Sequence, residues 1–104
     1  MSDACEFCSE FHPLEQHHIA QGVDRAAAGD NPACSIWICQ DCHTWIQGVR
    51  DCRPIGLAII KIRRPDDYDL EEFYRVTNRR FPDAASVKKW VKRLRVGVLL
   101  QRGE

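Results

Sequence analysis

Two pairs of cysteines constrain this sequence more than any other feature. Both pairs have the spacing Cys-x-x-Cys, and 30 residues separate Cys8 of the first pair from Cys39 of the second. Two such turns can place four thiolates at the corners of a tetrahedron, the geometry that Zn²⁺ prefers, with Zn–S bonds of about 2.3 Å. We therefore predict one structural zinc ion bound by Cys5, Cys8, Cys39 and Cys42, which closes a hairpin with a long loop.

The length of the chain explains why a metal would matter. The chain has 104 residues, enough for one hydrophobic core, and a chain of this size buries only about 60–70% of its unfolded surface. A structural zinc site contributes about 10–16 kcal/mol of apparent binding free energy. The net stability of a typical domain is about 5–15 kcal/mol, so zinc binding alone could decide whether the chain folds.

Other uses of the cysteines remain as alternatives. The amino-terminal sequence MSDACEFCSEF is acidic and lacks the apolar stretch of a secretory signal, so we expect a cytoplasmic protein with reduced thiols. Residues 39–43, CQDCH, also match the pattern for covalent haem attachment, but haem would leave Cys5 and Cys8 unexplained. A redox-active pair is a further alternative. Cys34 and Cys52 have no partner at comparable spacing and are expected to be free, buried thiols.

Charge is segregated along the chain although the formal net charge is zero. Residues 1–52 contain 2 basic and 8 acidic residues, a net charge of −6, and residues 53–104 contain 13 basic and 7 acidic residues, a net charge of +6. A basic half can bind a polyanion, although its basic residues could equally form a solvated helix face. No apolar run approaches the roughly 20 residues that span a bilayer, so no membrane-spanning segment is expected.

The segment between the cysteine pairs predicts a β-hairpin followed by a helix. Residues 14–20 have the character of a short strand, residues 21–33 read as a loop, and residues 35–38 form a second apolar strand. From Asp41 the spacing of apolar and polar residues becomes helical, and Gly48 marks the end of this helix.

The second half of the chain predicts one strand and two helices. Residues 53–64 are rich in isoleucine and flanked by prolines, which favours a strand packed on the preceding helix. A helix follows from Asp69, and another begins at Asp83, with Trp90 on its apolar stripe. The basic residues of the last helix and of the segment before it are expected to contact phosphates: Arg79, Arg80, Lys88, Lys89, Lys92, Arg93 and Arg95.

Three histidines lie beside the cysteine pairs in the sequence. Adjacent side chains on a strand point to opposite faces, so His17 and His18 should have different roles. One can bind a divalent cation together with His43, and the other can act as a general base, because imidazole is largely neutral at physiological pH. His12, next to a proline, is expected on the surface.

The order of these motifs resembles a known family. CxxC, LEQHHI, a glycine-containing loop, a short apolar strand and CxxCH followed by a helix are similar to the HNH endonucleases, particularly the small phage and bacterial members that carry a structural zinc. The resemblance covers about residues 5–62. It implies a ββα-metal fold in which His17 and His43 bind the catalytic divalent ion and His18 is the general base.

Two positions depart from the family pattern. The place of the family's middle asparagine is occupied by Cys34, and Asn31, three residues earlier, could take over the orienting role only if the loop is reshaped. The family often has another histidine one turn after His43, where this chain has Gln47. A neutral amide is a weaker ligand than imidazole, but with water and phosphate oxygens it could complete the oxygen-rich shell that Mg²⁺ accepts.

These observations give one overall expectation. The fold is α+β, with a zinc-stapled HNH domain over residues 1–65, including a short strand, and a basic helical extension over residues 66–104. The function is metal-dependent hydrolysis of DNA, with structural Zn²⁺ and a catalytic Mg²⁺, Mn²⁺ or transition-metal ion. Because the three histidines remain, we expect reduced activity rather than none. The alternative is a catalytically decayed zinc module that binds nucleic acid or a protein partner. A phage packaging role is a guess suggested by the family.

Overall fold

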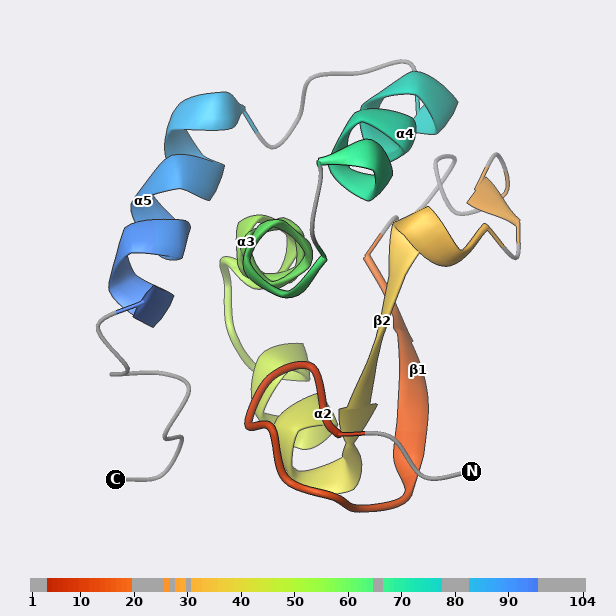
Figure 1. Ribbon diagram of the computed structural model, residues 1–104, viewed down its shortest axis with the longest axis vertical. Coiled ribbons are helices and arrows are strands. Elements are labelled where there is room, and N and C mark those ends of the chain that lie inside the picture. Colours follow the sequence, from red (N-terminus) through yellow and green to blue (C-terminus); the bar gives the residue numbers. More distant parts are fainter. Residues whose placement is uncertain are drawn as a thin grey trace.

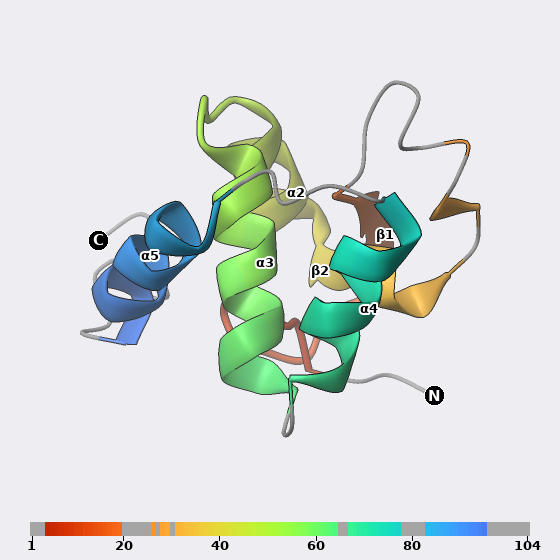
Figure 2. The same cartoon turned by 90° about the horizontal axis from the view of Figure 1, so that it is seen from above.

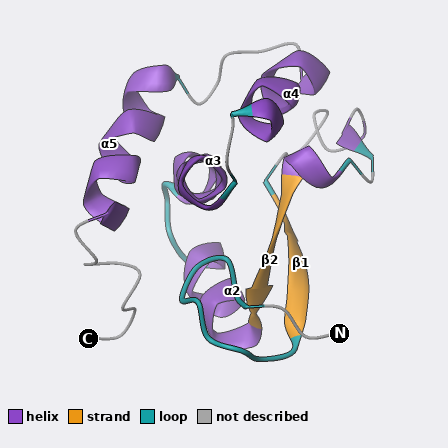
Figure 3. Cartoon of the chain, in the orientation of Figure 1, coloured by secondary structure: helices purple, strands orange, loops and turns teal. Residues whose placement is uncertain are grey.

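The computed structural model describes residues 4–19, 26, 28–29, 31–64, 67–77 and 83–95. Two short strands come first. Between them lie the helical residues 26 and 28, within the expected loop, and a 3₁₀ turn; the elements after them are α-helices (Figures 1 and 3). The elements are β1 (Leu14–His18), η1 (Pro32–Cys34), β2 (Ser35–Cys39), α2 (Gln40–Gln47), α3 (Cys52–Arg63), α4 (Tyr68–Thr77) and α5 (Ala84–Arg95). The described part of the chain is therefore α+β, as expected.

The two strands form the predicted hairpin. β1 pairs with β2 in an antiparallel sheet whose register runs from Leu14 opposite Cys39 to His18 opposite Ser35. Helix α2 starts directly after β2, with Cys39 at the N-cap position and Gly48 at the C-cap position. Strand, strand and helix thus follow one another as the sequence predicted, and they bring the second cysteine pair beside the first.

The expected strand over residues 53–64 is wrong, because this segment is helix α3. Its central residues, from Ile55 to Ile60, are all buried, and a helix that is apolar on all sides belongs in a protein interior. Twelve residues also exceed the usual length of a buried strand, while Pro54 is tolerated in the first turn of a helix. Figure 1 shows α3 end-on in the middle of the molecule, between α5 on one side and α4 and the hairpin on the other.

Helix α3 approaches the end of β1 very closely at Gly56. A Cβ atom added there would lie 2.9 Å from Cγ1 of Ile19, which is fully buried and directly follows His18. Real side chains do not pack at that distance. The absence of a side chain at Gly56 therefore lets the histidine-bearing strand end pack against the central helix.

The last two helices flank α3 (Figure 2). Phe73 of α4 and Val87, Trp90 and Leu94 of α5 belong to the same buried cluster as the residues of α3. Trp90 is 8% exposed, which confirms its place in the core, and its Nε1 donates a hydrogen bond of 3.3 Å to Asp51. The division into domains 1–65 and 66–104 stays a prediction.

Two helix starts differ in how well the sequence indicated them. Helix α5 starts directly after Asp83, as expected. The Asp83 side chain accepts a hydrogen bond of 2.8 Å from the Ser86 amide and caps the helix. Asp69 lies inside α4 rather than at its cap, and its carboxylate instead pairs with Arg64 at 2.9 Å.

Arg64, at the end of α3, connects several elements through one guanidinium group. It forms two hydrogen bonds, of 2.9 and 3.0 Å, with the carboxylate of Glu6 in the first cysteine turn. It also donates to the carbonyl oxygens of Pro32 and Ser35 and to the carboxylate of Asp69. One side chain therefore links the first cysteine turn, η1, β2 and α4. Among the described residues, no helix has both the length and the apolar character needed to cross a membrane.

Candidate functional site

The four cysteines of the two Cys-x-x-Cys pairs meet in one cluster. Their sulfur atoms all lie within 4.8 Å of one another, and Sγ of Cys8 is 4.0 Å from Sγ of Cys39. A tetrahedral ion with Zn–S bonds of about 2.3 Å requires sulfur–sulfur distances of about 3.8 Å. The donor set and its spacing therefore fit a structural metal ion such as zinc, as the sequence predicted.

The cluster favours negative charge on sulfur. The backbone amides of Phe7, Cys8 and Cys39 all point at Sγ of Cys5, at 3.3–3.4 Å. A hydrogen bond from the Cys42 thiol and these amides together lower the pKa of Cys5 to about 4, against the opposing effect of burial. The pKa of Cys42 is raised because its thiol donates to Cys5 and is buried. The environment of Cys5 therefore favours the thiolate form, which attracts a cation.

A second group of polar side chains, including three histidines, lines a cavity of about 350 Å³ at the end of β1. His17 of β1 and His43 of α2 meet there, with ring centroids 5.2 Å apart and ring planes at 77°. We call this cavity the histidine pocket, and its lining residues are Gln16, His17, His18, His43, Gln47 and Cys52. The structure therefore brings together the three histidines and the glutamine that the sequence singled out.

His17 has a donor atom without a partner. The residue is only 6% exposed, and within the described part of the chain its Nε2 makes no hydrogen bond. Buried polar atoms are almost always satisfied, so an exception calls for an explanation. Burial, with smaller contributions from His43 and His18, lowers the pKa of His17 to about 4. A neutral imidazole with an unused buried nitrogen fits a metal ligand.

His43 is oriented by a carboxylate that the sequence interpretation missed. Its Nδ1 lies 2.8 Å from Oε1 of Glu15. Because a carboxylate only accepts hydrogen bonds, Nδ1 is the donor. In the neutral ring, Nε2 is then the nitrogen with the free lone pair, an arrangement typical of metal-bound histidines. The strand period could have found this residue, since Glu15 and His17 are two apart on β1 and share a face.

His18 lines the same pocket as His17 although adjacent strand residues face opposite ways. His18 is the last residue of β1, and a cavity at the end of a strand can be lined from both faces. The expectation of opposite faces therefore does not separate the two side chains into different sites. His12 lies outside the pocket, half-exposed, and hydrogen-bonds to Glu10 at 3.0 Å.

The two expected orienting residues do not line the pocket. The Asn31 side chain accepts a hydrogen bond from the Ala33 amide at 2.9 Å and donates one to Glu72 at 3.2 Å, so it joins η1 to α4. Cys34 is 2% exposed and packs in the core, where burial raises the pKa of its thiol. Cys52 was predicted as a free, buried thiol, but it is only partly buried and lines the pocket; no spacing in the sequence pointed to this position.

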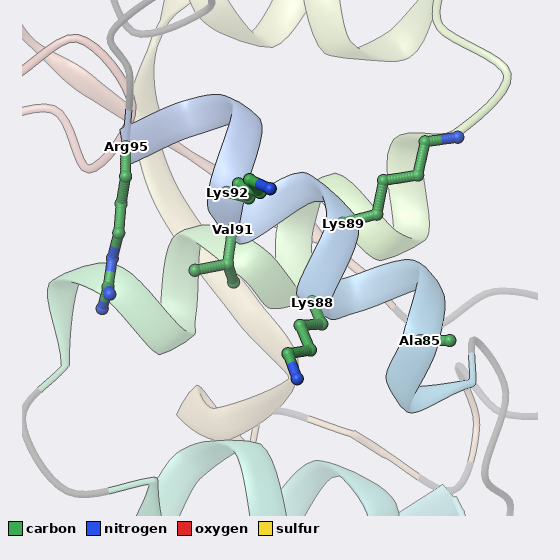
Figure 4. Close-up of a pocket in the computed structure, with 6 residues that line it drawn as sticks. All are labelled: Ala85, Lys88, Lys89, Val91, Lys92 and Arg95. Atoms are coloured by element: carbon green, nitrogen blue, oxygen red, sulfur yellow. The ribbon is translucent and has the colours of Figure 1, made fainter.

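A separate basic surface covers the outer side of α5. The cationic side chains extend away from the helix in different directions around a surface hollow of about 680 Å³ (Figure 4). We call this surface the α5 basic face, and it is lined by Ala85, Lys88, Lys89, Val91, Lys92 and Arg95. Arg93 differs from these, because its guanidinium lies 4.9 Å from the centre of the Trp90 ring. Arg79 and Arg80 lie outside the described residues.

The cysteine cluster and the histidine pocket have helix α2 in common. β1 supplies His17 and His18, the end of β2 supplies Cys39, and α2 supplies Cys42 and His43. The metal-binding turns and the histidines are therefore parts of one small unit. Comparison with models of known protein families, with curated proteins and with solved structures gives no match for this chain.

Proposed function

We propose that this protein is a metal-dependent endonuclease of the HNH type that hydrolyses phosphodiester bonds in DNA. One observation supports the proposal above all others. His17 and His43 are distant in the sequence, but their ring centroids lie 5.2 Å apart. They line a cavity that His18 and Gln47 also line. A β-hairpin followed by a helix brings them together, as the HNH resemblance implies.

The two imidazoles at the centre of the pocket would hold the catalytic ion. His17 offers a buried nitrogen without a hydrogen bond, and Glu15 fixes the ring of His43 so that its Nε2 keeps a lone pair. Gln47, one turn after His43 on α2, adds a neutral oxygen ligand. A bound divalent ion would stabilise the charge that develops on the phosphate and on the leaving 3′ oxygen.

His18 would move the proton in this reaction. It lines the pocket beside His17 but is less buried, so water can reach it. As general base, His18 takes a proton from a water molecule that then attacks phosphorus in line with the leaving oxygen. Glu15 keeps the ring of His43 in one orientation while this occurs, and the hairpin keeps His17 and His18 at the same strand end.

The α5 basic face would hold the DNA backbone. No residue from Ala84 to Arg95 is acidic, and within the described part of the chain no ion pair involves Lys88, Lys89, Lys92 or Arg95. Each lysine or arginine that neutralises a phosphate releases condensed counterions, which makes the affinity fall with salt concentration. We therefore expect DNA affinity that decreases steeply as salt increases.

The proposal is tested by cleavage of supercoiled plasmid DNA with Mg²⁺ or Mn²⁺. A general base contributes about 100- to 10,000-fold in rate, so His18→Ala should lower the cleavage rate by that amount. His12→Ala is the matched control, because His12 is half-exposed and lies outside the pocket. Cleavage that is equally fast in the parent and in His18→Ala would remove the mechanism.

A specific observation favours a second candidate, a decayed HNH module that binds nucleic acid or a protein partner. Neither Asn31 nor Cys34 lines the pocket, so the family's middle asparagine has no counterpart there among the described residues. Loss of an orienting group commonly costs about 10- to 100-fold in metal affinity or activity. Salt-dependent DNA binding that requires Lys88 and Lys92, with no cleavage in any divalent metal, would support this candidate over the nuclease.

A further inference from the structure

We propose that Cys52 is a third protein ligand of the ion in the histidine pocket and makes this pocket selective for transition metals. This inference rests on the proposed function, because it concerns the same ion. Cys52 is the first residue of α3 and lines the pocket together with His17, His43 and Gln47. It is half-buried, unlike the core thiol of Cys34.

The pocket needs an additional strong ligand. Two imidazoles and a neutral amide form a weak donor set, since the amide oxygen of Gln47 carries no charge. Catalytic zinc sites commonly have three protein ligands, including mixed cysteine and histidine sets, and leave the fourth position open for water or substrate. With Cys52, the pocket would supply two imidazoles and a thiolate, while Gln47 could stay near the open position.

The unpaired nitrogen of His17 is the independent observation that points to a bound ion. Its Nε2 is buried and makes no hydrogen bond within the described residues, although His17 lines the same cavity as Cys52. A cation that binds this nitrogen would supply the missing partner. Cys52 is therefore one of two candidate ligands in this cavity. The other is the imidazole of His17, whose Nε2 makes no hydrogen bond within the described residues.

The possible ligand atoms of the histidine pocket are farther apart than the sulfur atoms of the four cysteines. Within the described part of the chain, the only group of three or more such side chains gathered closely enough to hold an ion is Cys5, Cys8, Cys39 and Cys42. A cysteine sulfur moves by rotation about a single Cα–Cβ bond. Cys52 also begins a helix of 12 residues, and the amino end of a helix stabilises negative charge such as that of a thiolate.

A thiolate ligand changes which metals the pocket binds. Thiolate and imidazole favour ions such as Zn²⁺ and Co²⁺, whereas Mg²⁺ prefers oxygen ligands. The metal at the histidine pocket is therefore a transition-metal ion. Excess Mg²⁺ should not displace Co²⁺ from this site.

Optical titration with Co²⁺ tests the inference without measuring activity. The protein is first loaded with one zinc ion per chain, and Zn²⁺ resists displacement by Co²⁺ because it binds such sites more tightly. Added Co²⁺ should occupy a second site and produce a near-ultraviolet sulfur-to-cobalt charge-transfer band. In Cys52→Ser this band should disappear and the cobalt affinity should fall at least about 10-fold, since removing even an outer-shell partner commonly costs that much.

Cys34→Ala is the matched control, because it removes a thiol that does not line the pocket, and it should keep both the band and the affinity. Zinc content and far-ultraviolet circular dichroism confirm that each variant is folded and that cobalt has not entered the cysteine cluster. In the parent protein, Co²⁺ should also slow alkylation of Cys52, a measurement that needs no variant.

Two results would overturn the inference. The first is a Cys52→Ser protein that binds Co²⁺ like the parent while His17→Ala does not, which leaves the nuclease proposal standing. The second is a parent protein that binds no cobalt beyond its zinc. In that case the nuclease proposal is tested separately, by comparing plasmid cleavage in Mg²⁺ by the parent and by His18→Ala.

Discussion

The cysteine cluster and the histidine pocket both use side chains of α2, where Cys42 and His43 are adjacent, yet they are prepared for metal to different degrees. In the cluster, four sulfur atoms already lie within 4.8 Å of one another, and three backbone amides point at Cys5. In the pocket, two imidazoles meet at 5.2 Å beside a glutamine and a thiol. The first has a complete ligand set, and the second has an incomplete one.

This difference matches the two ways in which proteins use metals. A structural site has all four positions filled by the protein, whereas a catalytic site leaves a position open for water or substrate. A closed site gains stability from its ion, and an open site gains reactivity. The comparison therefore predicts that substitutions in the two sites have different effects. Loss of a ligand in the cluster should impair folding, and loss of a ligand in the pocket should impair binding of a second ion.

The largest expected effect is loss of the fold when the cluster loses its ion. Chelation removes a contribution of about 10–16 kcal/mol, which is as large as the whole net stability of a typical domain. The substitution Cys42→Ser removes one of the four ligands and should weaken the same contribution. Cooperative thermal unfolding, followed by circular dichroism, should vanish and return when zinc is added back to the parent. Cys34→Ala, a substitution of a buried thiol outside the cluster, should keep a zinc-dependent transition. An apoprotein that melts like the zinc-loaded protein would contradict the comparison.

A smaller loss of stability is expected when the cluster loses its link to the rest of the molecule. Arg64→Ala leaves the carboxylate of Glu6 without its main partner, and the side chains of this pair are 18% and 19% exposed. Breaking a buried ion pair costs about 3–5 kcal/mol, so we expect about 3 kcal/mol in urea unfolding. Arg75→Ala breaks a pair with Glu72 whose arginine is 71% exposed, and it should cost much less stability, because solvent screens an exposed ion pair. Equal losses in the two variants would show that the location of Arg64 is unimportant.

The pocket can be weakened without touching the cluster by removing Glu15. In Glu15→Ala, the ring of His43 loses the carboxylate that holds it at 2.8 Å. We expect the affinity for a second ion, measured by calorimetry with Mn²⁺ or Co²⁺, to fall about 10- to 100-fold. Zinc content should not change. Glu10→Ala removes an equal charge from the same amino-terminal part and should leave both metals unaffected; a similar drop in that variant would show that charge alone is responsible.

The smallest expected effect comes from the contact between the central helix and the strand end. In Gly56→Ala, the added methyl group meets Ile19 at 2.9 Å. Overpacking costs about 1–3 kcal/mol, and the better helix propensity of alanine returns about 1 kcal/mol, so a net loss of up to about 2 kcal/mol is expected in urea unfolding. In Gly48→Ala the added methyl group lies 3.6 Å from the Trp45 carbonyl oxygen, an ordinary contact, and stability should change less. A more stable Gly56→Ala protein would mean that Ile19 moves aside freely.

The sequence predicted the hairpin, helix α2 and the cysteine cluster because each depends on local signals. Cys-x-x-Cys spacing, strand-forming runs and the glycine that ends α2 act within a few residues. The cluster could be predicted although 30 residues separate the two pairs, because two Cys-x-x-Cys pairs in one chain have few roles other than binding a metal ion. The histidine pocket followed from the same reasoning, since His17 and His43 adjoin segments that the cluster brings together.

Long-range packing accounts for what the sequence did not predict. Residues 53–64 were expected as a strand because they contain several isoleucines, but the core surrounds this segment on all sides and favours a helix. Glu15 and Cys52 were missed for different reasons. Glu15 required the strand period to be applied to a charged residue, whereas Cys52 reaches the pocket only because α3 starts there, which no spacing reveals.

The position of Arg64 has a consequence for how the molecule loses its structure. Its guanidinium donates hydrogen bonds to four groups. These are the carboxylate of Glu6 in the first cysteine turn, the carbonyl oxygens of Pro32 and Ser35, and the carboxylate of Asp69 on α4. When the cysteine turn opens, Glu6 leaves, and a half-buried positive charge remains next to α4 with only part of its compensation. Demetallation should therefore spread from the amino-terminal turn to a helix that begins at Tyr68, and hydrogen exchange in α4 would register the loss of an ion that α4 never contacts.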